Sequence, residues 1–150
     1  MATMLSATAG SRLRTGNHSE HAGRLQVIIP YTTPKLTRAA LAAAAGMARG
    51  LHIETILLAV HIVPYPLPLH YPDVPLARLR EQLEAFVSAS GMSCGVRLVL
   101  ARDREQALRQ MLRGRALVVV ATRKRWWRTR EERMARGLSR AGHGVALVKV

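Results

Sequence analysis

The amino-acid sequence predicts an α/β protein, a three-layer sandwich built around a mainly parallel, five-stranded sheet. Five short apolar runs alternate along the chain with stretches of helical period. The strands expected at these runs occupy residues 25–29, 54–62, 96–100, 116–121 and 144–150. Strands that alternate with helices form a parallel sheet covered on both faces, and such strands are apolar nearly throughout. We expect the connections between them to be right-handed.

The first strand and the helix after it carry local start and stop signals. Pro30 ends the first apolar run, and Thr33 is expected to cap a helix that has Pro34 in its first position. Alanines and leucines then recur at helical spacing up to Gly50, which ends the helix.

The second strand, residues 54–62, is followed by a loop that cannot be regular structure. Residues 63–75 contain five of the seven prolines, and proline breaks helices and removes a backbone donor from a strand. We expect an extended crossover that lies over the carboxyl edge of the sheet as a partial lid. The alternation of Pro64, Pro66 and Pro68 leaves a polyproline ligand for a partner module as an alternative.

Two further helices precede the end of the chain. One is expected from Leu76 to near Gly91. Asp103 can cap the next, which Gly114 would end.

The chain closes on a βαβ unit formed by residues 116–150. The loop over residues 122–128 reads Thr-Arg-Lys-Arg-Trp-Trp-Arg, and a helical pattern follows over about residues 129–140. In such a unit the loop leaves its strand at the carboxyl edge of the sheet, where open α/β folds bind ligands. This loop is therefore the first candidate for a binding site.

Composition narrows the class of protein. Hydrophobic residues make up 49% of the chain, which argues against general disorder. Cys94 is the single cysteine, so no disulfide forms within the chain, and a reducing compartment such as the cytoplasm fits. No apolar run reaches the roughly 18 residues of a membrane span.

Residues 1–23 show no helical or strand periodicity and are expected to be a flexible tail, with one domain over residues 24–150.

The positive charge is concentrated in the second half of the chain. Of the net +14, residues 76–150 carry 17 Arg/Lys against 6 Asp/Glu, a net +11. Such an imbalance indicates an anionic partner: nucleic acid, a phosphate ligand or an acidic membrane surface. Twenty of the 23 basic residues are arginine, which a coding bias alone would also produce. The charge by itself does not choose among these functions.

Together these segments resemble the universal stress protein family over residues 24–150. The resemblance rests on the order, length and apolar character of the elements. Its cues are Val27-Ile28-Ile29-Pro30, Ala39-Ala40-Leu41, Thr55-Ile56-Leu57-Leu58-Ala59-Val60-His61, the proline-rich second loop, Ala116-Leu117-Val118-Val119-Val120-Ala121 and Val145-Ala146-Leu147-Val148. It implies an adenine-nucleotide alpha-hydrolase-like fold with strand order 3-2-1-4-5.

The resemblance does not extend to the nucleotide motif. Nucleotide-binding members of the family carry an aspartate after the proline of the first strand, where Thr32 stands here, and glycines after the fourth strand. Residues 122–133 contain no glycine, and Gly137 and Ser139 come too late, inside the expected helix. Glycines let backbone N–H groups approach phosphates. We therefore expect a degenerate ATP site and no cofactor, with ATP left open as a weak ligand.

The expected site lies at the carboxyl edge of the sheet. Its candidate ligand residues follow three strands: Tyr31, Thr32, Thr33, His61, Thr122, Arg123, Lys124 and Arg125. Contacts with an anion or a partner are expected from Trp126, Trp127, Arg128 and Arg130, because bases stack on tryptophan and phosphates pair with arginine. Two alternatives stay open for the tryptophans, namely packing on the last helix near Met134 and a subunit contact.

The sequence predicts a non-enzymatic binding or regulatory module. No zinc-type cluster, Walker loop or recognisable catalytic arrangement occurs, so no catalytic or metal-binding residue is assigned. The alternatives are a nucleic-acid- or polyanion-binding protein and a divergent nucleotide-binding or ATP-hydrolysing protein. The apolar last strand, with Val145, Leu147 and Val148, is expected at a sheet edge, where two copies would pair as a homodimer as in the family.

Overall fold

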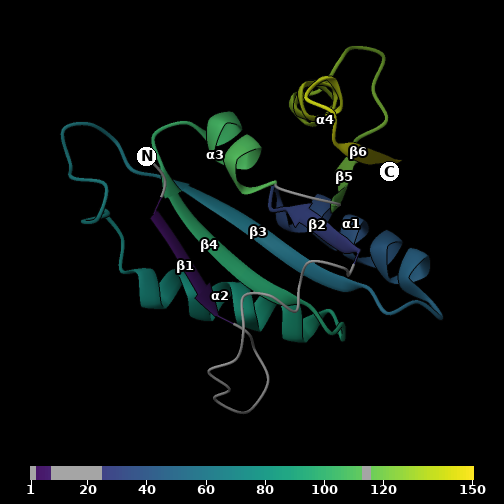
Figure 1. Ribbon diagram of the computed structural model, residues 1–150, viewed down its shortest axis with the longest axis horizontal. Helices are drawn as coiled ribbons and strands as arrows, with labels where there is room; N and C mark the ends of the chain where they lie inside the picture. The colour runs from purple at the N-terminus through teal and green to yellow at the C-terminus, as the bar shows by residue number, and fades with distance from the viewer. Residues whose placement is uncertain (1–2, 8–24, 113–115) are drawn as a thin grey trace.

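A six-stranded sheet forms the middle layer of the computed structural model (Figure 1). The structure describes residues 3–7, 25–112 and 116–150. The strands are β1 (Thr3–Ala7), β2 (Gln26–Pro30), β3 (Glu54–Ile62), β4 (Gly95–Ala101), β5 (Ala116–Thr122) and β6 (Gly144–Lys149). They are ordered β1-β4-β3-β2-β5-β6 across the sheet. Strands β2 to β6 are parallel, and counting from β2 gives the order 3-2-1-4-5, which confirms the predicted sheet.

The N-terminal segment adds an edge strand that no sequence pattern predicts. β1 pairs antiparallel with β4, from Thr3 opposite Leu100 to Ala7 opposite Val96. The expectation of a flexible tail is therefore wrong for Thr3–Ala7, and the rest of that tail lies outside the described residues. The physical reason is that β4 would otherwise present a row of open backbone donors and acceptors at the sheet edge.

Four helices cover the sheet in the described part of the chain, two on each face (Figure 1). They are α1 (Pro34–Ala48), α2 (Leu76–Ala89), α3 (Arg104–Met111) and α4 (Arg130–Arg140). α1 and α2 share one core cluster, to which Leu41 and Val87 belong. α3 and α4 share the other, with Leu108 and Leu138. The three-layer arrangement is thus as predicted, and no described helix is long and apolar enough to cross a bilayer.

The central strands are buried on both faces. Along β3, Leu57 belongs to the α1–α2 core and Leu58 to the α3–α4 core. β2 alternates in the same way, with Ile29 in the first core and Ile28 in the second. Both faces of the sheet need apolar side chains, which is why the sequence shows continuous apolar runs at these strands.

Cys94 lies just before β4 and is part of the α1–α2 core. Its side chain is only 7% exposed. Burial raises the pKa of the Cys94 thiol to about 11. The thiol therefore stays protonated at neutral pH and packs as a small apolar residue.

Side-chain caps start three helices at the carboxyl edge of the sheet. The hydrogen bonds run from Leu36 N–H to Thr33 Oγ1 (3.3 Å), from Gln106 N–H to Asp103 Oδ1 (2.7 Å) and from Glu132 N–H to Thr129 Oγ1 (3.2 Å). The predicted caps Thr33 and Asp103 are confirmed, and Pro34 occupies the first position of α1. The predicted helix stop at Gly114 lies outside the described residues.

Candidate functional site

The carboxyl edge of the sheet has a switch point between β2 and β5. From β2 the chain leads through α1 to β3 on one side, and from β5 it leads through α4 to β6 on the other. Residues 31–33 and 123–129 leave these two strands toward opposite faces of the sheet. Ligands of open α/β folds bind in the crevice that such a divergence creates.

A hollow of about 410 Å³ opens at this switch point. Thr33 and Leu36 line it at the start of α1, and the segment after β5 supplies the rest of its lining: Arg123, Arg125, Trp127, Arg128, Thr129, Arg130, Glu131 and Arg133. Five of these residues are arginines, all solvent-exposed, and Glu131 is the one acid among the described lining residues. We call this space the arginine hollow.

The segment that carries these arginines is anchored at both ends. Thr122 is fully buried, and its Oγ1 lies within hydrogen-bonding distance of Thr129 Oγ1, the cap of α4. The N–H of Lys124 donates to Val150 O at 2.8 Å. Residues 125–128 lie between these anchors and are all exposed. The anchors therefore hold a short basic segment at the edge of the sheet with its side chains open to solvent.

The two tryptophans of this segment do not pack into the protein. Trp126 is 91% exposed and Trp127 is 56% exposed. Their ring centroids lie 5.5 Å apart, and the guanidinium of Arg125 lies 5.9 Å from the centre of the Trp127 ring. The alternative that both tryptophans cover α4 is wrong for Trp126, because a packed ring would lose most of its exposed surface.

A second large hollow lies between α2 and the sheet. Its volume is about 330 Å³, and we call it the α2 hollow. It is lined by Tyr31, Thr32, Ala59, Val60, His61, Leu79, Gln82, Leu83, Phe86, Leu98 and Arg104. A smaller space of about 150 Å³ lies between the two, where Thr32 and Arg104 face Thr33 and Arg130. The carboxyl edge thus has an apolar end and a basic end.

The structure divides the predicted ligand residues between these spaces. Tyr31, Thr32 and His61 line the α2 hollow. The residues that line the arginine hollow are Thr33, Arg123, Arg125, Trp127, Arg128 and Arg130. Thr122 is buried beneath the arginine hollow, whereas Lys124 and Trp126 line neither of these two described hollows. The predicted residues therefore lie at the carboxyl edge of the sheet but are divided between two hollows, and their role in binding stays a prediction.

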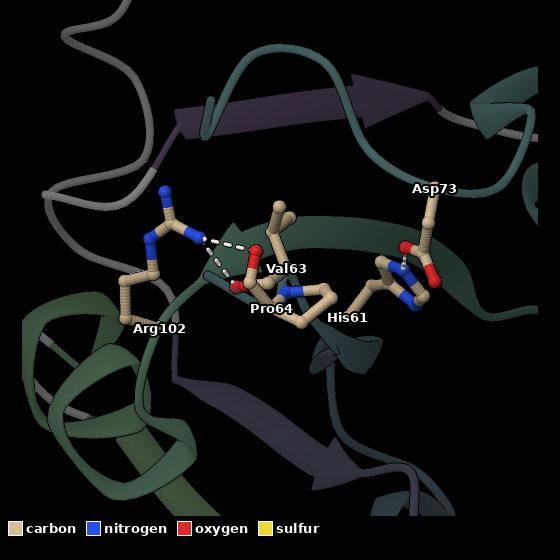
Figure 2. A network of polar contacts seen from close by, with 5 residues as sticks. All are labelled: His61, Val63, Pro64, Asp73 and Arg102. Carbon is tan, nitrogen blue, oxygen red and sulfur yellow. Dashed lines mark hydrogen bonds and ion pairs between the residues drawn. The ribbon is translucent and has the colours of Figure 1, made fainter. Parts of the chain in front are cut away.

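The proline-rich crossover is fixed to the carboxyl edge by Arg102, at the end of β4 (Figure 2). The Arg102 guanidinium donates to the carbonyl oxygens of Val63 at 2.7 Å and Pro64 at 2.9 Å, and also to that of Leu67. It also lies 4.1 Å from the centre of the Tyr65 ring. One side chain thus holds the first third of the crossover at the carboxyl ends of β3 and β4. No crossover residue lines the described hollows, so the partial lid stays a prediction.

His61 anchors the far part of the same crossover. Its Nε2 lies 2.9 Å from Asp73 Oδ1 (Figure 2). The hydrogen bond with His61 lowers the pKa of Asp73. His61 lines the α2 hollow, but this nitrogen is occupied by Asp73, so the geometry gives His61 a structural contact in addition to its predicted place at the site.

Three arginines of this edge were not singled out from the sequence. Arg102 holds the crossover, Arg104 lies at the mouth of the α2 hollow, and Arg133 lines the arginine hollow. Arg133 lies one helical turn beyond the cap Thr129, a spacing that points it back toward the loop and could have identified it. Arg102 and Arg104 had no comparable signal in a chain so rich in arginine.

The last strand lies at a sheet edge, as predicted. Among the described strands, β6 pairs with β5 and has no other neighbour. Val145 and Val148 are half-buried, and Leu147 is 38% exposed. The pairing continues one residue further, where the N–H of Val150 donates to Thr122 O at 2.9 Å.

No group of three or more His, Cys, Asp or Glu within the described ranges could hold a metal ion.

Comparison with known proteins supports the fold alone. The structure is similar to that of a universal stress protein from Archaeoglobus fulgidus, with a TM-score of 0.60 and 15% sequence identity. The match covers 83% of this chain and 93% of the other. No protein-family model matches the sequence, and no curated protein sequence matches it. The chain therefore has a universal-stress-protein-like fold.

Proposed function

We propose that the chain is a non-enzymatic binding module of the universal-stress-protein type, which acts in the cytoplasm and takes an anionic small ligand in the arginine hollow. One observation carries the proposal: five arginines and Trp127 surround a space of about 410 Å³ at the switch point of the sheet. Arginine pairs with phosphate or carboxylate through a planar fork, and an indole ring can stack on a flat ligand. The buried, unpaired Cys94 suits a reducing compartment.

The side chains of the hollow replace the backbone contacts that a glycine-rich loop would make. Residues 122–133 have no glycine, so a phosphate chain cannot approach the backbone closely there. The exposed arginines still attract an anionic ligand, but water and salt screen this attraction. Such a site favours loose, salt-sensitive binding and supports a degenerate ATP site. Glu131 is a lone carboxylate among the described lining residues, which supports a binding role over a hydrolytic one.

Titration calorimetry with ATP tests the proposal. At moderate salt we expect a binding free energy no stronger than about −4 to −6 kcal/mol, which corresponds to dissociation constants from roughly tens of micromolar to the millimolar range. Replacing Arg125 and Arg128 together by serine should weaken it about tenfold or more, because charge-assisted contacts are lost. The double variant Arg49→Ser/Arg109→Ser changes the net charge equally at residues outside the hollow and should bind as the unmodified chain does. Low-micromolar ATP binding, or equal losses in both variants, would contradict the proposal.

We also propose that two copies pair along β6 as a homodimer. The support is the open outer edge of this strand and the exposed Leu147, because an apolar edge invites another strand. Light scattering at tens of micromolar should give twice the 16.5 kDa mass of the chain. Leu147→Lys places a charge on that edge and should shift the mass toward the monomer. A monomer mass for the unmodified chain would refute the pairing.

A second candidate function is the binding of single-stranded nucleic acid or another polyanion. The specific observation in its favour is Trp126, which is 91% exposed beside exposed cationic side chains. Stacking platforms next to arginine and lysine are the usual features of proteins that bind single strands without sequence preference.

A further inference from the structure

The α2 hollow leaves apolar side chains in contact with water. In α2 the only buried residue is Val87, although Leu79, Leu83 and Phe86 all point toward the hollow and line it. From the sheet side, Ala59 and Leu98 complete the apolar lining, whereas Val60 borders the hollow but packs against the α3–α4 core. The volume of about 330 Å³ is at the lower end of the range typical of small-molecule sites. An apolar ligand would remove this surface from water, which is favourable.

Arg104 gives this hollow one charged group. Its Nε is buried and has no hydrogen-bond partner among the described residues. A buried donor without an acceptor is costly, and a shift of the Arg104 side chain toward an acceptor bound in the hollow would relieve that cost. The described residues that line the hollow include no acid. Arg104 also lines the adjoining smaller space, where Glu105, Glu131 and Arg130 lie, so on the α2 side an acceptor would have to come from a ligand.

The environment of Arg104 favours an anion. Burial, followed by the nearby positive charge of Arg130, lowers the pKa of Arg104. An arginine nevertheless keeps its proton in proteins, so the protein bears the cost of a partly buried charge beside a second cation. A negative group at this place would offset both the desolvation and the repulsion.

A single arginine in apolar surroundings suits a carboxylate better than a phosphate chain. The guanidinium fork matches the two oxygens of one carboxylate. For a more highly charged group such as a phosphate chain, the free-energy cost of losing hydration would exceed the gain from pairing with a single arginine. The polar lining residues Thr32 and Gln82 offer further hydrogen-bonding groups to such a head.

We propose that the α2 hollow binds a small apolar carboxylic acid, whose apolar body lies between α2 and the sheet and whose carboxylate pairs with Arg104. This site is distinct from the arginine hollow, because the two share no lining residue. The carboxylate site therefore extends the proposed function and does not depend on it. Either of the two proposals can be refuted without the other.

Octanoate is the probe that tests this proposal, with the full chain and methyl-resolved NMR. Titration should shift the methyl signals of Leu79, Leu83 and Leu98 in a saturable, one-site manner. Octan-1-ol and octylamine have the same apolar chain without the negative charge, and we expect each to bind at least tenfold more weakly. Shifts elsewhere in the spectrum, or equal affinity for the alcohol, would overturn the proposal.

Two variants test separately how much the Arg104 charge and the apolar cavity contribute to octanoate binding. Arg104→Gln should weaken octanoate binding tenfold or more and leave octan-1-ol unchanged, whereas Ala59→Phe should fill the hollow and abolish both. Arg133→Gln is the matched control, since it removes an arginine from the arginine hollow and should leave octanoate binding intact while weakening ATP. If Arg104→Gln keeps full octanoate affinity, the assignment to Arg104 is wrong, even where Ala59→Phe fails to fold.

Discussion

Replacing Arg102 by methionine should lower the free energy of unfolding by about 2–3 kcal/mol, because hydrogen bonds to a charged donor contribute more than neutral ones. The change removes the contacts with the carbonyls of Val63, Pro64 and Leu67, and the packing on the Tyr65 ring. Methionine keeps the apolar stem of the side chain, so the loss reports the guanidinium. Thermal unfolding followed by circular dichroism should show a midpoint lower by about 5–10 °C.

The control for this prediction is Arg109→Met. Arg109 is exposed, and its pair with Glu105 at 3.6 Å is a surface contact, so its removal should change stability by less than about 0.5 kcal/mol. Limited digestion with chymotrypsin gives a second measurement. In the crossover, Leu69 is followed by the exposed His70 rather than by a proline, and cleavage after Leu69 should accelerate in Arg102→Met alone. Equal stability and equal cleavage in the two variants would show that Arg102 does not hold the crossover.

The sequence predicts the parallel sheet well because the local patterns and the tertiary structure agree. The run at 54–62 is apolar since both faces of β3 are covered, and it matches the observed Glu54–Ile62. Thr33 and Asp103 are recognisable as caps because capping depends on residues only three positions apart. Such short-range signals can be read without knowing the fold.

The features that the sequence did not predict depend on contacts between residues far apart in the chain. β1 pairs with residues of β4 that lie far along the chain, and five residues are too few to show a reliable period. Arg102 and the carbonyls it holds are 35 to 39 residues apart in sequence, and nothing distinguishes it locally from the other 19 arginines. The exposure of Trp126 depends on the path between two anchors, so its contact could not be decided from the residue types alone.

A single-stranded oligonucleotide such as a dT12 strand should bind the segment around Trp126 with steep salt dependence. Arg123, Lys124, Arg125 and Arg128 are all exposed there. Each phosphate that they neutralise contributes about −0.7 to the slope of log affinity against log salt. The triple variant Arg123→Ser/Lys124→Ser/Arg128→Ser should therefore flatten the slope by about 2. Trp126→Ala should weaken binding by about 1–3 kcal/mol through the loss of one stacked base.

Tryptophan fluorescence measures this binding directly, because the chain's two tryptophans, Trp126 and Trp127, both lie in this segment. The control is Arg49→Ser/Arg78→Ser/Arg109→Ser, which lowers the net charge equally at exposed sites away from the segment. If attraction to the overall charge of +14 were the whole effect, both triple variants would flatten the slope alike and Trp126→Ala would bind normally. That result, or an absence of quenching at low salt, would exclude this segment as a nucleic-acid interface. A loss confined to the Trp126 segment would establish a local contact in which stacking and charge act together.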